Sequence, residues 1–418
     1  MVKISSVKGR QVFDSRGNPT VEAEVILENG LSATAISPSG ASTGAFEAYE
    51  LRDKDNKIFL GKSVYKAVKN INTTINNNLS GQNPHNQEDI DKILIKLDGT
   101  ENKKNLGANT LLAVSLATAK ISATEKKISL FKSLGKSYSL PLPLMNIVNG
   151  GAHADNDLNI QEFMIRPDSA KNLTDAIEKC FLVIQNLKKI LKSKKMLTNV
   201  GDEGGFAPSI NSNEEALGLI VDAIEKSNLI PGSDVSICLD VAANELRNFK
   251  GEYSIESNSF SGVDEVIQYY KKLIDKYPIK SIEDPFSEED WNAWKKITFE
   301  IGKKIQIVGD DLFVTNTVRL QRGIKENSAN SILIKPNQIG TLSETLDVIN
   351  LAKKNNFKTI ISHRSGDTED TFIADLSVAT ESSQIKTGSL ARSERVAKYN
   401  RLIRIEEELG KSIKMARV

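Results

Sequence analysis

The sequence predicts an α/β protein that combines a (β/α)8 barrel with a smaller N-terminal α+β domain. The chain has 418 residues, which exceeds the length of a typical single domain. From about residue 235, short β-rich runs alternate with longer helix-period segments, a rhythm typical of a parallel sheet. The earlier part instead places strands before helices. We therefore expect an N-terminal domain over residues 1–135 and a barrel over residues 136–418.

The N-terminal elements follow in order. Strands are expected over residues 21–30 and 31–37, and helices over residues 61–79 and 107–127. The stretch NTTINNNLSG is compositionally biased and favours a surface loop. The run SLGKSYSLPLPLMNIVNGG, with its prolines and glycines, is expected to link the two domains.

Six strand–helix units make up the second part, with room for two more upstream, and this number favours a closed barrel over an open sheet. Each predicted strand precedes a predicted helix of ten or more residues. The six strands are VSICLD, IKSIED, IQIVGD, SILIK, KTIIS and QIKTG.

The composition excludes some classes of partner. Hydrophobic residues make up 39% and charged residues 26% of the chain, as in ordinary globular proteins. A formal net charge of +1 gives no electrostatic reason to expect nucleic acid or a membrane as the main partner. No signal-length apolar segment opens the chain and no stretch approaches the ~18 apolar residues of a membrane span, so we expect a cytoplasmic protein. Cys180 and Cys238 lie in apolar contexts, which favours buried free thiols over a disulfide.

Titratable residues stand at the ends of all six predicted strands. Such ends carry the catalytic residues of barrel enzymes, and here they are Asp240, Glu283, Asp310, Lys335, His363 and Lys386. A single carboxylate would be explained as a cap of the next helix. Three unpaired carboxylates that converge on one barrel mouth repel one another and need a cation. An all-oxygen ligand set favours Mg2+ first and Mn2+ next.

A cation at this expected site would allow a neighbouring lysine to act as a base. A lysine near a divalent ion and a second lysine has its ammonium form disfavoured, so it can act as a base. A lysine base and Mg2+ together can remove a weakly acidic proton next to a carboxylate, because the metal stabilises the doubly charged intermediate. The residues alone therefore indicate metal-assisted proton abstraction α to a carboxylate.

Three further stretches add candidate parts. The small-residue loop SPSGASTGAFEAYELRD is either a flexible surface turn or a mobile lid whose hydroxyls reach a phosphate or a second metal. The segment VNGGAHADNDLNIQEFMI carries His153 and Glu162, and NVGDEGGFAP carries Glu203, which could supply a proton to a leaving group. His85 is expected in a surface loop without a role.

Assembled in this order, the stretches resemble the enolase family. The matching motifs run along nearly the whole chain and include FDSRGNPTVE, SGASTG, NGGAHADN, NVGDEGGFAP, SIEDPF, GDDL, IKPNQIGTL, SHRSGDTEDTFIADL and KTGSLARSERVAKYNRLIRIEEELG. The resemblance implies reversible dehydration of 2-phospho-D-glycerate to phosphoenolpyruvate in glycolysis, with two Mg2+ per active site. It also implies a barrel that begins with an antiparallel strand, and a homo-oligomer, either a dimer or an octamer.

The resemblance also implies residue roles by motif. Lys335 would abstract the C2 proton, and Glu203, assisted by Glu162, would expel the C3 hydroxyl. The first Mg2+ would be held by Asp240, Glu283 and Asp310, and Ser42 of the SGASTG lid would close over the second. Substrate would contact Ser42, His153, Gln161, His363, Arg364, Ser365 and Lys386. Arg364 and Ser365 would hold the phosphoryl group, and Asp367 and Glu369 would be helix caps.

Departures from the family pattern are few. Phe46 stands where many relatives have histidine, Lys54 where glycine is common, and Asn105 where a basic residue is usual. A sugar-acid dehydratase or racemase of the wider superfamily shares the metal acids and the lysine base but lacks the SGASTG, GDEGG and SHRSG stretches. A scaffold protein that had lost catalysis would also have lost the lysine base, the acid or the metal ligands, all of which are present.

Overall fold

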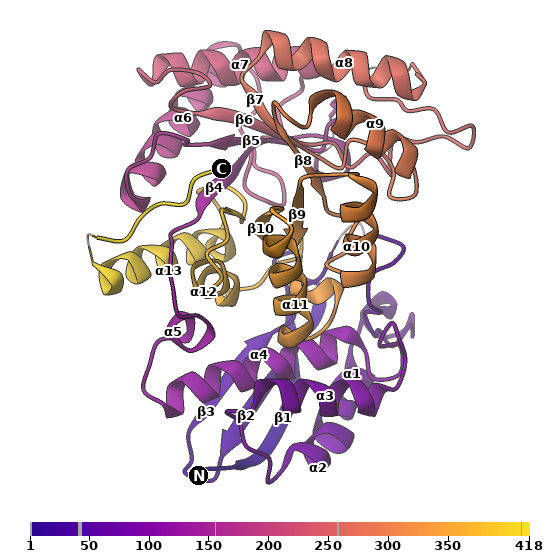
Figure 1. Cartoon of the computed structure of the whole chain (residues 1–418), viewed down its shortest axis with the longest axis vertical. Coiled ribbons are helices and arrows are strands. Elements are labelled where there is room, and N and C mark those ends of the chain that lie inside the picture. The colour runs from indigo at the N-terminus through magenta and orange to yellow at the C-terminus, as the bar shows by residue number, and fades with distance from the viewer. Residues whose placement is uncertain (1, 41–43, 155, 257–258, 411) are drawn as a thin grey trace.

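The computed structural model of the chain describes residues 2–40, 44–154, 156–256, 259–410 and 412–418. A three-stranded sheet with its helices forms one end of the molecule, and a closed eight-stranded barrel forms the other (Figure 1). This arrangement confirms the predicted fold class, whereas a domain boundary between residues 135 and 136 stays a prediction. Among the described residues, no helix is long and apolar enough to cross a membrane.

The N-terminal sheet is antiparallel, in the order β1 (Ile4–Phe13), β2 (Pro19–Leu27) and β3 (Ser32–Ile36). Alternate residues of β2 are buried, and helix α4 (Ala108–Glu125) packs on β2 and β3. Helix α4 is buried on almost all sides between the sheet and barrel elements, so its sequence shows no distinct polar face. Strand β1 was not predicted, since only its Ile4 and Val7 are buried and no clear alternation marks it.

The predicted loop NTTINNNLSG is wrong, because most of it is helical. It lies in a continuous run of α1 (Tyr65–Asn70), a π-helical turn η2 (Ile71–Ile75) and α2 (Asn76–Leu79). The apolar residues at every fourth position of this run are fully buried. The asparagines lie against the sheet edge, where the side-chain oxygens of Asn72 and Asn76 accept hydrogen bonds from backbone amides of β1. These bonds satisfy edge amides that would otherwise face solvent.

The remaining N-terminal elements are η1 (Phe59–Gly61), α3 (Gln87–Asp98) and α5 (Leu130–Leu134). His85, just before α3, is half-buried rather than a surface-loop residue. Its Nδ1 lies 2.9 Å from the Ser122 hydroxyl and its Nε2 lies 3.1 Å from the Glu125 carboxylate, both on α4. His85 therefore joins α3 to α4.

The barrel strands are β4 (Leu142–Asn149), β5 (Glu162–Arg166), β6 (Ser236–Asp240), β7 (Ile279–Glu283), β8 (Gln306–Gly309), β9 (Ser331–Ile334), β10 (Lys358–Ser362) and β11 (Gln384–Lys386). Neighbouring strands are parallel except that β5 runs antiparallel to both β4 and β6. This finding confirms the antiparallel strand that the resemblance implied. Strand β4, buried at every position, occupies the second half of the predicted linker, which is wrong there.

Eight helices accompany the strands: α6 (Leu173–Ser193), α7 (Asn213–Lys226), α8 (Val263–Lys276), α9 (Trp291–Ile301), α10 (Thr317–Glu326), α11 (Leu342–Lys354), α12 (Phe372–Ala379) and α13 (Ser393–Leu409). The six predicted strand–helix units are present. Upstream, among the described residues, two adjacent strands, β4 and β5, precede two adjacent helices, α6 and α7. Short 3-10 turns η3 (Gly151–His153) and η4 (Pro336–Gln338) follow β4 and β9.

The barrel interior is packed with apolar side chains from alternate strand positions. One layer consists of Leu144, Met164, Cys238, Val308, Leu333 and Ile360. Cys238 and Cys180 are both buried and unpaired, which confirms the prediction of free thiols. Because side chains alternate along a strand, Cys238 and Asp240 both point inward, and the apolar layer supports the polar residues at the mouth.

Candidate active site

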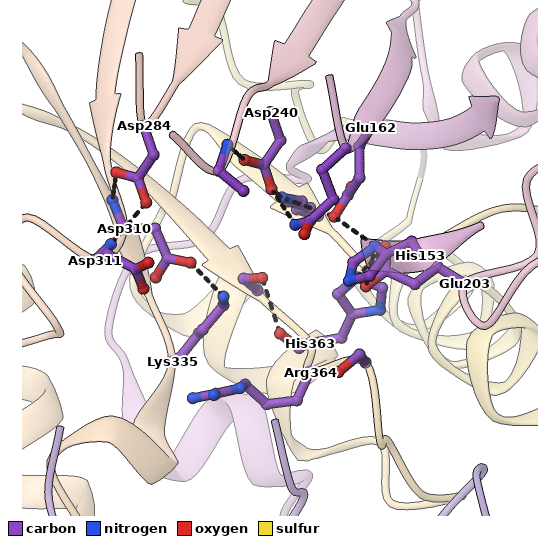
Figure 2. A pocket seen from close by; sticks show the side chains of 15 residues that line it. His153, Glu162, Glu203, Asp240, Asp284, Asp310, Asp311, Lys335, His363 and Arg364 are labelled. Atoms are coloured by element: carbon purple, nitrogen blue, oxygen red, sulfur yellow. Dashed lines mark hydrogen bonds and ion pairs between the residues drawn. The ribbon is translucent and has the colours of Figure 1, made fainter. Parts of the chain in front are cut away.

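A pocket opens at the carboxyl ends of the barrel strands. Figure 2 shows two groups of acids on opposite sides of it, one with Asp310 and one with Glu203, and Lys335 beside Asp310. The pocket brings together the predicted residues His153, Gln161, Glu162, Glu203, Asp240, Asp310, Lys335, His363, Arg364, Ser365 and Lys386. Glu283 is buried next to them. Ser42 lies outside the described residues.

The three predicted metal acids come from neighbouring strands. Asp240 and Glu283 are the last residues of β6 and β7, and Asp310 directly follows β8; each is at most 6% exposed. The ammonium group of Lys386 lies 2.8 Å from Asp240 Oδ2 and 2.9 Å from Glu283 Oε1. Lys335 donates to Asp310. Lysine side chains thus supply the positive charge among these carboxylates.

The donor set fits a hard divalent cation. Burial, and then the charge of Asp240, raise the pKa of Glu283 well above its ordinary value despite Lys386. Burial alone would lower the pKa of Lys386, but Asp240 and its other acidic neighbours outweigh it and raise that pKa. Buried oxygen donors with an excess of negative charge are the ligands that Mg2+ prefers. Asp240, Glu283 and Asp310 could therefore hold such an ion.

A second acidic group was missed in the sequence. Carboxylate oxygens of Asp284, Asp310 and Asp311 lie within 4.8 Å of one another. Asp284 accepts 2.9 Å hydrogen bonds from the backbone amides of both Asp310 and Asp311. Burial, and then the charge of Asp310, raise the pKa of Asp311 to about 7. The available signal was the second acid in SIED and in GDD, directly after each predicted ligand.

On the other side of the pocket, ligand atoms of His153, Glu162 and Glu203 lie within 4.8 Å of one another. Glu162 is the first residue of β5 and pairs with Asp240, the last residue of β6. Because β5 is antiparallel, its starting end faces the mouth.

The two glutamates differ in protonation. Burial, and then the charge of Glu203, raise the pKa of Glu162 well above its ordinary value. Burial would also raise the pKa of Glu203, but His363 and His153 outweigh it and lower that pKa. The two shifts run in opposite directions, so Glu162 has the higher tendency of the pair to be protonated.

Glu203 is held by a close-packed glycine loop. A Cβ on Gly205 would lie 2.2 Å from the side-chain oxygen of Asn149, so a larger residue cannot occupy this position without displacing Asn149. Gly204 has a φ of +86°, a conformation that favours glycine. Asn146 on β4 donates to Glu203 Oε2 at 3.2 Å and helps to orient it.

Arg364, after β10, forms a two-point ion pair with a residue next to the lid stretch. Its Nη1 and Nη2 lie 2.9 Å and 3.2 Å from the two carboxylate oxygens of Glu47. Glu47 also accepts from the amide of Gly44 at 3.1 Å and from Gln338 Nε2 at 3.4 Å. Gln338 in turn donates to Asp310 Oδ1 at 2.9 Å. Glu47 thus connects the predicted phosphoryl site, the lid stretch and a predicted metal ligand.

Phe46, the departure from histidine, makes a contact of its own. Its ring centre lies 4.0 Å from the guanidinium carbon of Arg319 on α10, a cation–π distance. The preceding amide, of Ala45, donates to the Glu288 carboxylate at 3.2 Å. The C-terminal side of the lid stretch is therefore anchored on the barrel.

Asp367 is not a helix cap as predicted. It is buried, and Lys398 on α13 donates to it at 2.7 Å, with Arg395 of the same helix 3.7 Å away. The N-cap position of α12 is Thr371. Arg395 and Lys398 therefore lie directly behind the loop that carries Arg364 and were missed, because a fully buried cation on a helix has no local sequence signal.

The predicted role of Lys335 as a base beside a divalent cation stays a prediction. Burial alone would lower the pKa of Lys335, but the directly paired Asp310 outweighs burial, and the pKa is raised. In this state Lys335 is an ammonium that neutralises Asp310.

A pocket lined by carboxylates at the mouth of an eight-stranded barrel is typical of barrel enzymes. Residues 137–417 match the family model described as enolase, C-terminal TIM barrel domain, and residues 4–134 match the enolase N-terminal domain. The chain is 62% identical over 420 residues to a protein named Enolase from Pelagibacter ubique (strain HTCC1062), with 100% of both chains covered. The chain belongs to the enolase family.

Proposed function

We propose that the chain catalyses the reversible dehydration of 2-phospho-D-glycerate to phosphoenolpyruvate, as a hydro-lyase of glycolysis that acts in the cytoplasm. The observation that supports this function is the meeting of a lysine, a pair of buried glutamates and an arginine in one carboxylate-lined pocket. These are the groups needed to remove a proton from one carbon, protonate a leaving hydroxyl on the next and bind a phosphoryl group.

The acids would hold two Mg2+ per active site. Asp240, Glu283 and Asp310 are the proposed ligands of the first ion, and Ser42 belongs with the second. When bound, the ions supply positive charge that stabilises a doubly charged carboxylate on the substrate.

The side chains of the chain carry out the proton transfers. Lys335, once neutral, takes the proton from C2, and the C–H electron pair remains on the substrate. The C3–O bond then breaks, and Glu203 delivers to the departing hydroxyl the proton held by the glutamate pair, so that water leaves. In the reverse direction Glu203, as a carboxylate, takes a proton from the attacking water.

Other residues bind and orient the substrate. Arg364 and Ser365 hold the phosphoryl group, for which a bidentate guanidinium is well suited. Lys386 offsets the negative charge at the substrate carboxylate. His153, Gln161 and His363 surround the leaving group.

A homo-oligomer, either a dimer or an octamer, is also proposed. Phe13, Phe59 and Leu60 are 51%, 44% and 83% exposed, and the first two rings meet edge to face at 5.8 Å. Exposed apolar clusters of this kind mark interaction sites. A second copy of the chain is the occupant that this proposal assigns to the cluster.

The test of the catalytic proposal follows the ultraviolet absorbance of phosphoenolpyruvate formed from 2-phosphoglycerate. We expect a signal that requires Mg2+ and that falls at least a thousandfold in Lys335→Ala, since general-base catalysis contributes about 10²–10⁴-fold. Lys54→Ala, at an exposed lysine, is the matched control and should retain activity. Absence of product from folded, Mg2+-loaded protein would favour a dehydratase or racemase of the wider superfamily, or a scaffold role.

A further inference from the structure

A fully buried arginine contacts a histidine of the pocket. Arg395 on α13 is 0% exposed, and its Nη1 lies 2.6 Å from Nδ1 of His363. The same guanidinium donates to the backbone carbonyls of Arg364 and Ser365, each at 2.6 Å, and to that of Asp202 at 3.2 Å. It therefore joins the histidine, the predicted phosphoryl loop and the loop that carries Glu203.

The chemistry of this contact allows only one arrangement of protons. A guanidinium has N–H donors and no acceptor, so the histidine nitrogen that faces it must be the unprotonated one. The single ring proton of neutral His363 then lies on Nε2. That atom is 3.4 Å from Oε2 of Glu203, on the pocket side of the ring.

We propose that Arg395 is a positioning residue that fixes the tautomer of His363, so that Nδ1 accepts from the arginine and Nε2–H faces Glu203. This role deepens the proposed function, because it sets the direction in which His363 can act. The N–H on Nε2 directs its partial positive charge at the Glu203 carboxylate, 3.4 Å away, and favours the carboxylate form. His363 cannot serve as the base that takes a proton from water or substrate.

The charged groups around His363 agree with this assignment. Burial lowers the pKa of His363 to about 4; Glu203 opposes this shift and Arg395 adds to it, while Asp367 opposes it more weakly. The imidazole is therefore neutral at pH 7. An imidazolium would place an N–H against the guanidinium.

The tautomer also agrees with the lowered pKa of Glu203. Glu203 Oε2 faces Nε2–H of His363 and accepts a hydrogen bond from Asn146 at 3.2 Å, and both favour its carboxylate form. Without Arg395, the ring would be free to adopt the other tautomer. An unprotonated Nε2 would then face the carboxylate and repel it.

The first experiment is long-range 1H–15N NMR on the full-length protein labelled with 15N-histidine. The chain has only three histidines, and His85→Gln, outside the pocket, identifies one set of signals. For His363 we expect an unprotonated Nδ1 and a protonated Nε2 throughout about pH 5.5–8. A protonated Nδ1 or an imidazolium in this range overturns the proposal, whatever the activity of the protein.

Variants then separate positioning from general stability. Arg395→Met should give His363 mixed tautomers and a titration nearer the ordinary histidine range, with kcat lowered about tenfold or more and a new pH dependence in the kcat profile. Lys398→Met removes another buried cation of α13 that bonds to Asp367 and Thr368 but not to His363. This control should keep the Nε2–H tautomer. An unchanged tautomer in folded Arg395→Met contradicts the proposal.

The outcome can be separated from that of the proposed function. The tautomer is measured without substrate or metal, so it can be confirmed in a protein that forms no phosphoenolpyruvate. Conversely, an active enzyme with the Nδ1–H tautomer would keep the proposed function and remove the role of Arg395.

Discussion

Individual buried charges determine much of the behaviour of this site, and Asp367 is the clearest case. It is 4% exposed and faces the two buried cations of α13. Burial would raise its pKa, but Lys398 and then Arg395 outweigh burial and lower it. Removal of this carboxylate takes away the acid that pairs with Lys398 and leaves that ammonium buried among backbone carbonyls.

We expect Asp367→Asn to lower the free energy of unfolding by about 3–5 kcal/mol, measured by urea denaturation at pH 7. The folded-state pKa of Asp367 lies below the unfolded value of about 3.9. Its contribution is therefore complete above that value and is lost as the pH falls through the folded-state pKa. The variant should lack this part of the acid-induced loss of stability.

Glu369→Gln provides the control for this prediction. Glu369 is an exposed acid two residues away, and its replacement should change stability by about 0.5 kcal/mol or less. Equal stabilities of the Asp367 variant and the wild type would show that the buried pair contributes nothing.

At the residue level, site residues could be predicted from the sequence where a titratable residue recurs at the end of successive strands. Titratable residues at the ends of six strands could be predicted, because parallel strands place these ends in one mouth. Asp367 was misassigned to a helix cap, because its partner Lys398 is distant in sequence. Asp284 and Asp311 were missed, although each follows a predicted ligand directly.

At the level of elements, the stretch Gly44–Glu50 connects the N-terminal part to the barrel mouth. Phe46 stacks on Arg319, and Glu47 pairs with Arg364. The base of the same loop is held by mutual backbone hydrogen bonds between Ser39 and Gly366, at 2.8 and 2.9 Å. Segments far apart in the sequence therefore hold Ser39 and the stretch Gly44–Glu50 against the barrel.

We expect Glu47→Gln to raise KM for 2-phosphoglycerate roughly 10- to 150-fold, with a smaller effect on kcat. An amide cannot accept from both Nη atoms of Arg364, and hydrogen bonds to charged groups contribute about 1.5–3 kcal/mol. Arg364 would lose its fixed orientation toward the phosphoryl group, which is bound equally before and after the reaction. Steady-state kinetics at saturating Mg2+ measures both constants.

Glu50→Gln is the matched control, because Glu50 lies in the same stretch but pairs with Arg52 at 2.6 Å. It should leave KM nearly unchanged. A normal KM in Glu47→Gln would show that the pair with Arg364 is not needed for substrate binding.

Which elements could be predicted depended on their neighbours. The later barrel strands were identified, because apolar runs bounded by helices show their period directly. Strand β4 was hidden by its two prolines, Pro141 before it and Pro143 within it, which also suit a linker. The helix expected over residues 61–79 is present from Tyr65, whereas the asparagines of NTTINNNLSG misleadingly indicated a surface loop because they bond to the edge of β1.

At the level of the whole molecule, the apolar cluster of Phe13, Phe59 and Leu60 predicts self-association. We expect Leu60→Asp to shift the protein to smaller species in sedimentation velocity, because a buried charge at an interface is strongly unfavourable. Phe249→Asp replaces an apolar residue that is 96% exposed in a barrel loop, and it should keep the wild-type size. A monomeric wild-type protein would contradict the homo-oligomer proposal.

The overall architecture could be predicted from the alternation of strand-like and helix-like segments, apart from the direction of one strand. Periodicity gives the alternation of strands and helices but does not tell whether a strand runs up or down. The described residues of the connection between β4 and β5 form the 3-10 turn η3 and no α-helix, as an antiparallel pair of strands permits. The result of the reversal of β5 is that Glu162 reaches the mouth from the start of a strand.

Alkylation of the two buried thiols can be used to measure transient opening of the barrel. Cys238 lies inside the barrel, and burial raises its pKa to about 12, so almost none of it is thiolate at neutral pH. The other thiol, Cys180, is buried on α6, and residues 1–135 contain no cysteine. The rate of alkylation therefore measures transient opening of the barrel. Transient opening of the N-terminal sheet does not change this rate, because the sheet carries no thiol.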